Sequence, residues 1–94
     1  RGATASAIKV LSQSVELADK LYALEPTSAV YQSLSATSHN SLGIAYVKSG
    51  QPTLAVQHLE SGVKRLEEMN QNHASDDLKV QLAIAHNDLS RALT

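Results

Sequence analysis

The stretch His39–Tyr46 (HNSLGIAY), continued by Lys48–Pro52 (KSGQP) and Ala55–Leu59 (AVQHL), decides the fold that we expect for this chain. Small and apolar residues recur in it at the three- and four-residue spacing of a helix face, before Gly50 and again after Pro52. Glycine commonly closes a helix, and proline is tolerated at the first position of the next one. The stretch therefore predicts two helices that fold back on each other at Gly50.

Small and large side chains alternate on the two predicted helix faces. The first face carries Leu42, Gly43 and Tyr46, and the second carries Ala55, Leu59 and Gly62. Because glycine and alanine take up little space, we expect the two helix backbones to approach each other closely.

These residues resemble the tetratricopeptide repeat. The pattern Leu42-Gly43-x-x-Tyr46 is similar to the first helix of that repeat, Gly50 to its turn, and Ala55 with the residues after it to its second helix. The resemblance extends from Ala36 to about Glu67, roughly a third of the chain. It implies an array of antiparallel helices whose concave face binds a protein or peptide.

The match departs from the family at three positions. His39 stands where the family usually has Trp, Leu or Asn, and Leu59 stands where an aromatic residue is common. Glu67 stands where proline is common, which suggests that the second helix continues beyond it.

Composition restricts the function classes that we consider. The chain has 94 residues, enough for one domain, and a net charge of −1, which gives no electrostatic case for nucleic acid or an anionic membrane. With no Phe or Trp and only three Tyr, it also offers few stacking platforms for bases. No cysteine is present, so disulfide and thiol chemistry are excluded, and we expect a cytoplasmic protein. No apolar run is long enough to span a bilayer.

The apolar period predicts an all-α fold of four helices, at about residues 5–24, 29–48, 52–69 and 76–93. Pro26 ends the first helix, with Thr27 or Ser28 as the cap of the second. Ser75 is the expected cap of the fourth helix, and residues 70–74 are expected to form a loop. The middle of the second helix is rich in Ser and Thr, so we expect packing rather than intrinsic propensity to form it.

The chain is also similar to itself. The pattern Ala7-Ile8-x-x-Leu11-x-x-Ser14-Val15 recurs 48 positions later as Ala55-Val56-x-x-Leu59-x-x-Gly62-Val63, and His39-Asn40-Ser41-Leu42 recurs 47 positions later as His86-Asn87-Asp88-Leu89. In the tetratricopeptide repeat the first helix is called A and the second is called B. The four predicted helices therefore alternate in type, as B, A, B and A. This period is longer than the 34 residues of the usual tetratricopeptide repeat. Because the chain starts with Arg1, we expect residues 1–94 to be a single helical domain within a longer repeat protein.

Asn40 and Asn87 occupy equivalent places in the two A-type helices, although asparagine is a poor helix former. In the family that these residues resemble, this side of the A helix lines the concave groove, where an amide can hydrogen-bond a peptide backbone. The alternative is that each amide bonds a neighbouring helix or faces water.

Five further residues share the predicted groove face. They are Thr37, Ile44 and Val47 beside Asn40, and Ile84 and Arg91 beside Asn87. Together they predict a mixed apolar and amide surface that suits an extended or helical peptide. The alternative is that Ile44 and Val47 pack against the adjacent A helix.

The sequence offers no case for catalysis or for a cofactor. The four histidines, His39, His58, His73 and His86, show no metal-ligand spacing, so we expect structural roles and no metal. No nucleophile–base motif is present, and we predict a protein that is not an enzyme.

We therefore predict a scaffold that binds a protein or peptide partner, with no nucleic acid, membrane or cofactor. One alternative is a structural module that self-associates through its terminal helices, because half repeats leave outer faces uncovered. Another is a sensor domain for a small ligand or a signal peptide.

Overall fold

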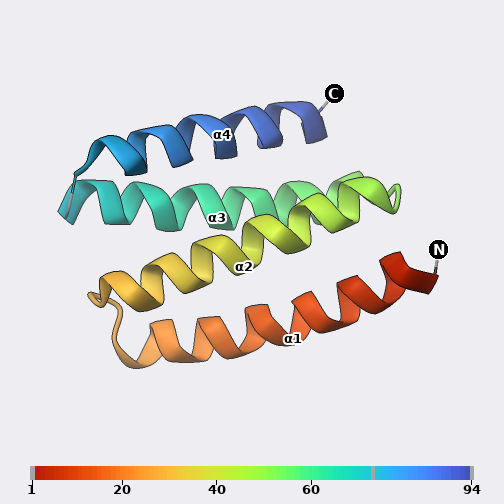
Figure 1. Cartoon of the computed structure of the whole chain (residues 1–94), viewed down its shortest axis with the longest axis horizontal. Coiled ribbons are helices and arrows are strands. Elements are labelled where there is room, and N and C mark those ends of the chain that lie inside the picture. Colours follow the sequence, from red (N-terminus) through yellow and green to blue (C-terminus); the bar gives the residue numbers. More distant parts are fainter. Residues whose placement is uncertain (1, 73, 94) are drawn as a thin grey trace.

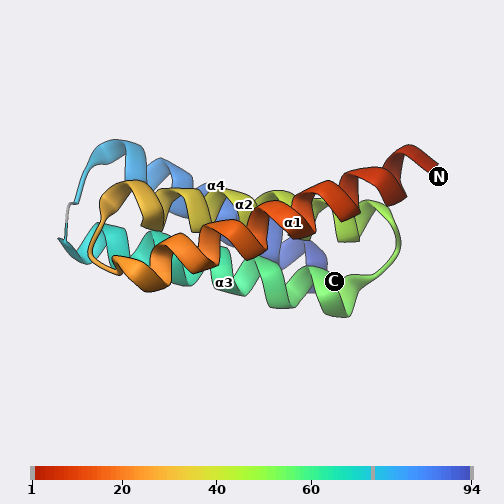
Figure 2. The ribbon, with the colours of Figure 1, turned by 90° about the horizontal axis from the view of Figure 1, so that it is seen from below.

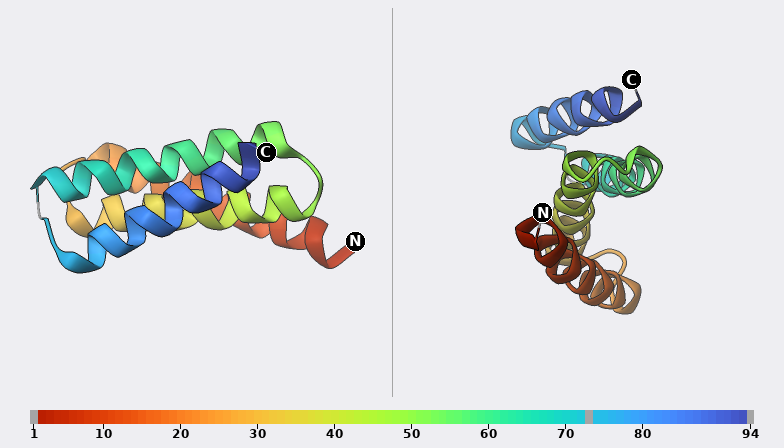
Figure 3. Two further views of the ribbon diagram at one scale, coloured as in Figure 1. Left: turned by 90° about the horizontal axis from the view of Figure 1, so that it is seen from above. Right: turned by 90° about the vertical axis from the view of Figure 1, so that its right-hand side faces the viewer.

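The computed structural model describes residues 2–72 and 74–93, which form four α-helices with no strand among them. The helices are α1 (Gly2–Leu24), α2 (Ala29–Lys48), α3 (Pro52–Asn72) and α4 (Asp76–Leu93). Successive helices run antiparallel, and α1 and α4 lie at opposite ends of the array (Figures 1 and 3). The predicted all-α, antiparallel helical array is confirmed. None of the described helices combines the length and apolar character needed to cross a membrane.

The ends of the helices follow the local signals in the sequence. The Ser28 hydroxyl accepts a hydrogen bond from the backbone N–H of Tyr31, and Ser75 does the same for Leu78. Each serine thereby satisfies one of the amide groups that the first turn of a helix leaves unpaired. Gly50 follows α2 with a φ of +77°, in the left-handed region that glycine enters without steric cost.

Two predicted boundaries were wrong by a few residues. Helix α1 begins at Gly2 rather than near residue 5, and its first turns extend past the α2–α3 connection (Figure 2). Helix α3 continues to Asn72 rather than ending near residue 69, so most of the predicted 70–74 loop is helical. Met69 packs against the apolar core, so packing favours the extra turn. His73 lies outside the described residues.

Helix α2 is the centre of the array, because it packs on both α1 and α3, most extensively on α3. Its buried positions are mainly small or polar, among them Ser35, Ala36, Gly43 and Ala45. Leu42 is its large fully buried apolar residue, and Leu59 of α3 is buried completely. The Ser- and Thr-rich helix is thus held by neighbours on two sides, as expected for a sequence with weak intrinsic propensity.

A polar cluster joins the C-terminal parts of α1 and α3. The Tyr22 hydroxyl donates a 2.7 Å hydrogen bond to Glu68, and this bond raises the pKa of Tyr22 above its ordinary 10.0. The Arg65 guanidinium lies 3.9 Å from the centre of the Tyr22 ring and donates to Glu68. Stacking and hydrogen bonding together fix the end of α1 relative to α3.

A substitution at Gly43 tests whether α2 and α3 approach each other closely. A Cβ atom added there would lie 2.6 Å from Cγ of the buried Leu59 and 3.2 Å from the backbone oxygen of Ala55. We expect Gly43→Ala to lower the free energy of unfolding by about 1–3 kcal/mol in urea denaturation, as overpacking does. In an unobstructed helix the same change would raise stability by up to about 1 kcal/mol. Unchanged or increased stability would therefore rule out the close approach.

Candidate functional site

A groove lies where the C-terminal parts of α2 and α4 approach each other above α3. It has a volume of about 280 Å³ and is lined by Ile44, Val47, Lys48, Leu59, Asp88 and Arg91. Leu59, which has no exposed surface, contributes the buried apolar part of the lining. Ile44 and Val47 remain 38% and 45% exposed and present apolar surface to a ligand.

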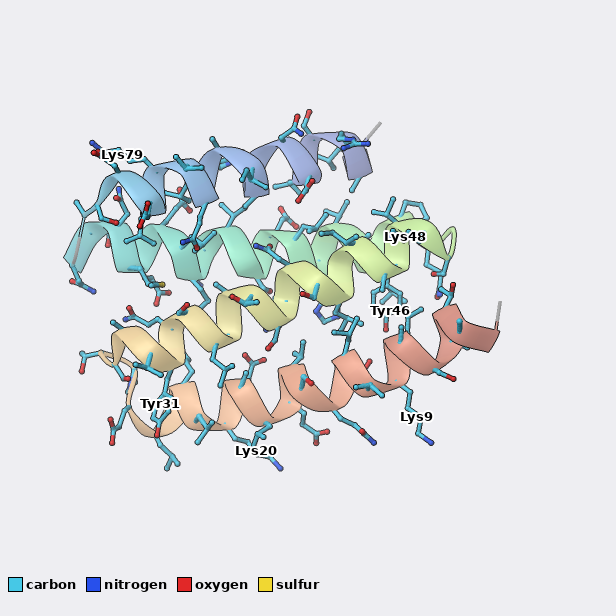
Figure 4. All side chains as sticks on the ribbon, in the orientation of Figure 1. Lys9, Lys20, Tyr31, Tyr46, Lys48 and Lys79 are labelled. Atoms are coloured by element: carbon cyan, nitrogen blue, oxygen red, sulfur yellow. The ribbon has the colours of Figure 1, made fainter. Side chains whose placement is uncertain are left out.

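The structure brings together three of the seven residues predicted for the binding face, namely Ile44, Val47 and Arg91. Lys48, Leu59 and Asp88 line the same groove and were not predicted. Lys48 directly follows Val47 at the end of α2, where Figure 4 shows it beside the α2–α3 connection. Leu59 was not predicted because the predicted binding face lay on A-type helices alone, whereas the B-type helix α3 also lines the groove.

The remaining predicted residues lie elsewhere. Thr37 lines a separate, shallow hollow on α2 with Val30 and Leu34. Ile84 is 57% exposed and Asn87 is exposed on α4, and neither lines the groove.

Asn40 faces α3 rather than the groove. Its side-chain oxygen lies against Gly62, in the space that a Cβ atom at that position would occupy. The oxygen is buried and has no hydrogen-bond partner among the described residues. Asn40 therefore packs on α3 without the hydrogen bond to a neighbouring helix that the alternative predicted for its oxygen. A binding role for the exposed Asn87 stays a prediction.

Charged groups surround the apolar part of the groove. Lys48 comes from α2, and Asp88 and Arg91 come from α4. The groove thus combines the apolar surface of Ile44 and Val47 with charged groups at its margin, a mixture typical of ligand sites. The arrangement suits a peptide better than a wholly apolar molecule.

A second cluster, which the sequence analysis missed, joins three helices through Asp19, His39 and His58. Nε2 of His39 lies 3.0 and 2.9 Å from the two carboxylate oxygens of Asp19 on α1. Nδ1 of His39 lies 3.0 Å from Nδ1 of His58 on α3. The Ser35 hydroxyl also donates to Asp19, and the Tyr46 ring stacks on His58. His39 therefore uses both ring nitrogens to connect α2 with its neighbours.

The hydrogen bonds of the Asp19–His39–His58 cluster determine which ring nitrogens of His39 and His58 carry hydrogen when both rings are neutral. Because Asp19 accepts, Nε2 of His39 carries hydrogen and its Nδ1 is the acceptor for Nδ1–H of His58. One added proton binds at Nε2 of His58, and a single hydrogen still lies between the two Nδ1 atoms. A second proton would set two N–H donors against each other and would remove this bond between α2 and α3.

The electrostatics of the cluster oppose protonation of His58. Burial lowers the pKa of His58 below its ordinary 6.5, and the neighbouring His39 lowers it further, whereas Asp19 acts in the opposite direction. His58 is therefore favoured in its neutral form in the folded chain.

The cluster resembles half of a charge-relay system in its Asp–His pair. A relay acts by activating a nucleophile at the second histidine nitrogen. That nitrogen of His39 contacts His58, and the nearby Ser35 hydroxyl bonds Asp19. The described residues also contain no group of three or more His, Cys, Asp or Glu side chains placed to hold a metal ion. The described bonds of the cluster support a role in joining helices.

The Asp19→Ala variant measures how much the Asp19 carboxylate contributes to the free energy of unfolding. The change leaves the buried His39 ring and the fully buried Ser35 hydroxyl without their acceptor. We expect the free energy of unfolding to fall by about 1–2 kcal/mol, the cost of unpaired buried donors. Glu16→Ala, at an exposed position of the same helix, is the control and should change stability by less than about 0.5 kcal/mol. Equal effects of the two substitutions would contradict the structural role of Asp19.

Stability should also depend on pH through His58. The unfolded chain binds the His58 proton at the ordinary pKa of 6.5, and the folded chain binds it more weakly. As the pH falls below 6.5, His58 binds more protons in the unfolded chain than in the folded chain. The free energy of unfolding therefore decreases progressively until the pH reaches the pKa of His58 in the folded chain. Urea denaturation at a series of pH values should give a shallower pH dependence for His58→Gln than for the parent. Parallel curves for the two proteins would refute this assignment.

Comparisons of the chain with protein-family models, with curated proteins and with solved structures find no match. The similarity of residues 36–67 to the tetratricopeptide repeat therefore stays a prediction from the sequence pattern.

Proposed function

We propose that the chain is a non-catalytic, tetratricopeptide-like scaffold that binds a segment of a partner protein in the groove between α2 and α4. The observation that carries the proposal is the position of Ile44 and Val47. Both are apolar, both are exposed, and they line one groove with the buried Leu59 and with charged residues of α2 and α4.

The chemistry of the groove specifies the kind of segment that fits. An aliphatic side chain of the partner would contact Ile44 and Val47, with Leu59 behind them. Burying a Val- or Leu-sized side chain contributes about 1.5–3 kcal/mol, enough for a weak, reversible contact. Lys48 at the margin would favour a segment with an acidic residue beside the aliphatic one.

The openness of the groove distinguishes this function from the sensor alternative. A site for a small ligand encloses most of the ligand surface. The groove is bounded by α2, α3 and α4 and opens to solvent, which suits a chain segment that continues past it.

The test is a selection of binding peptides from a random displayed library, followed by titration of the selected peptides. Ile44→Glu/Val47→Glu should weaken their binding by about tenfold or more, because the change places two charges in the apolar contact. Both positions are partly exposed, so helicity measured by circular dichroism should be preserved.

Val30→Glu is the matched control. Val30 is an exposed apolar residue of the same helix, 71% accessible, and it lines the other hollow. Peptides that bind the parent and the control but bind the groove variant weakly or not at all would support the proposal. Peptides unaffected by the groove substitutions, or the absence of any selected peptide, would refute it.

A further inference from the structure

A further hollow lies between the N-terminal turns of α1 and the C-terminal turns of α2, and we call it the α1–α2 hollow. It has a volume of about 320 Å³, and most of the residues that line it are small or apolar. Ala3, Ala7 and Leu11 line it from α1, and Ala45 lines it from α2. Because Ala3 and Ala7 are exposed, the hollow is open to solvent, as the groove between α2 and α4 is.

Two residues of α2 connect this hollow with the groove. Ile44 and Lys48 line both of them, and being four positions apart they lie next to each other on one face of the helix. Val47 lines the groove alone, and Ala45 lines the α1–α2 hollow alone. Helices α1 and α4 lie on opposite sides of α2 (Figure 1). The groove and the hollow therefore form one surface that crosses the C-terminal part of α2.

Lys48 gives this surface an accessible positive charge between its two apolar parts. The side chain is exposed, and its ammonium group makes no hydrogen bond or ion pair with any described residue. Among the described residues that line the surface, the charged ones are Lys48, Arg91 and Asp88, which is two cations to one carboxylate. Charge complementarity therefore favours a partner that brings a carboxylate to Lys48 over a basic partner.

An extended segment of a partner protein fits a surface of this width. A helix with its side chains is about 10–12 Å across. Residues i, i+2 and i+4 of an extended chain point to the same side and span about 13 Å, at about 3.3 Å per residue. The first and last of these side chains can therefore occupy the groove and the α1–α2 hollow while the middle one meets Lys48.

Building on the binding function proposed above, we propose that the bound segment continues across α2 into the α1–α2 hollow. The segment is extended, and it carries an acidic residue between two aliphatic ones. The acidic side chain pairs with Lys48, and the aliphatic side chains contact Val47 on one side and Ala7 on the other.

The first test compares substitutions on the two sides of α2, in titrations with library peptides selected for binding to the parent. Val47→Glu changes the groove alone, and Ala7→Glu changes the α1–α2 hollow alone. Ser6→Glu is the matched control, because Ser6 is exposed beside Ala7 and lines neither. We expect Val47→Glu and Ala7→Glu each to weaken binding by about tenfold, and Ser6→Glu by less than about twofold, with helicity unchanged in all three.

The second test exchanges the charges. Lys48→Gln should weaken the binding of an acidic peptide by about two- to fivefold, as expected for a partly exposed ion pair, and should not affect a copy whose acidic residue is replaced by its amide. Lys48→Glu should bind a copy with lysine at that place more tightly than the acidic peptide. Lys64→Glu is the control, because this exposed lysine of α3 lines neither the groove nor the hollow, and it should keep the preference of the parent.

The outcomes separate this proposal from the binding function on which it rests. If Val47→Glu abolishes binding but Ala7→Glu does not, or if Lys48→Glu leaves the charge preference unchanged, the groove is a binding site and the crossing segment is refuted. Peptides that are insensitive to Val47→Glu would overturn the binding function and the crossing segment together. A parent that dimerises in light scattering, and that Val47→Glu makes monomeric, would identify a second copy as the occupant and would overturn the proposal as well.

Discussion

The contact of Leu59 with the backbone of Gly43 sets the spacing between α2 and α3, and the rest of the array depends on this spacing. A side chain on Gly43 would occupy the space that Leu59 fills. Gly62 of α3 likewise leaves room for the Asn40 side chain of α2. With two glycines at complementary positions, α2 and α3 form the most extensive helix pair of the structure.

Close packing on two sides explains why α2 buries polar groups. A central helix made of large apolar residues would hold α1 and α3 apart, whereas small residues such as Ser35 and Ala36 do not. The buried hydroxyl of Ser35 and the ring of His39 then need partners, because an unpaired buried donor is costly. Asp19 accepts from both and remains partly exposed, so its charge keeps contact with solvent.

The groove is a consequence of the alternating helix array. Each helix packs on its neighbours in the chain, and faces that lack a neighbour stay accessible. Between α2 and α4 the accessible surface is concave, with Ile44 and Val47 beside charged residues, which suits a chain segment.

The sequence by itself determined the four helices, a cap at Thr27 or Ser28, a cap at Ser75, and the turn at Gly50, because these features depend on local backbone preferences and on the helical period. Of the seven residues that it predicted for one binding face, Ile44, Val47 and Arg91 line one groove. Only the tertiary structure decided that Asn40 faces α3 and that Asp19, His39 and His58 meet. Asp19 and His39 are twenty positions apart on different helices, so their contact depends on the rotation and spacing of those helices, which small residues at helix crossings set.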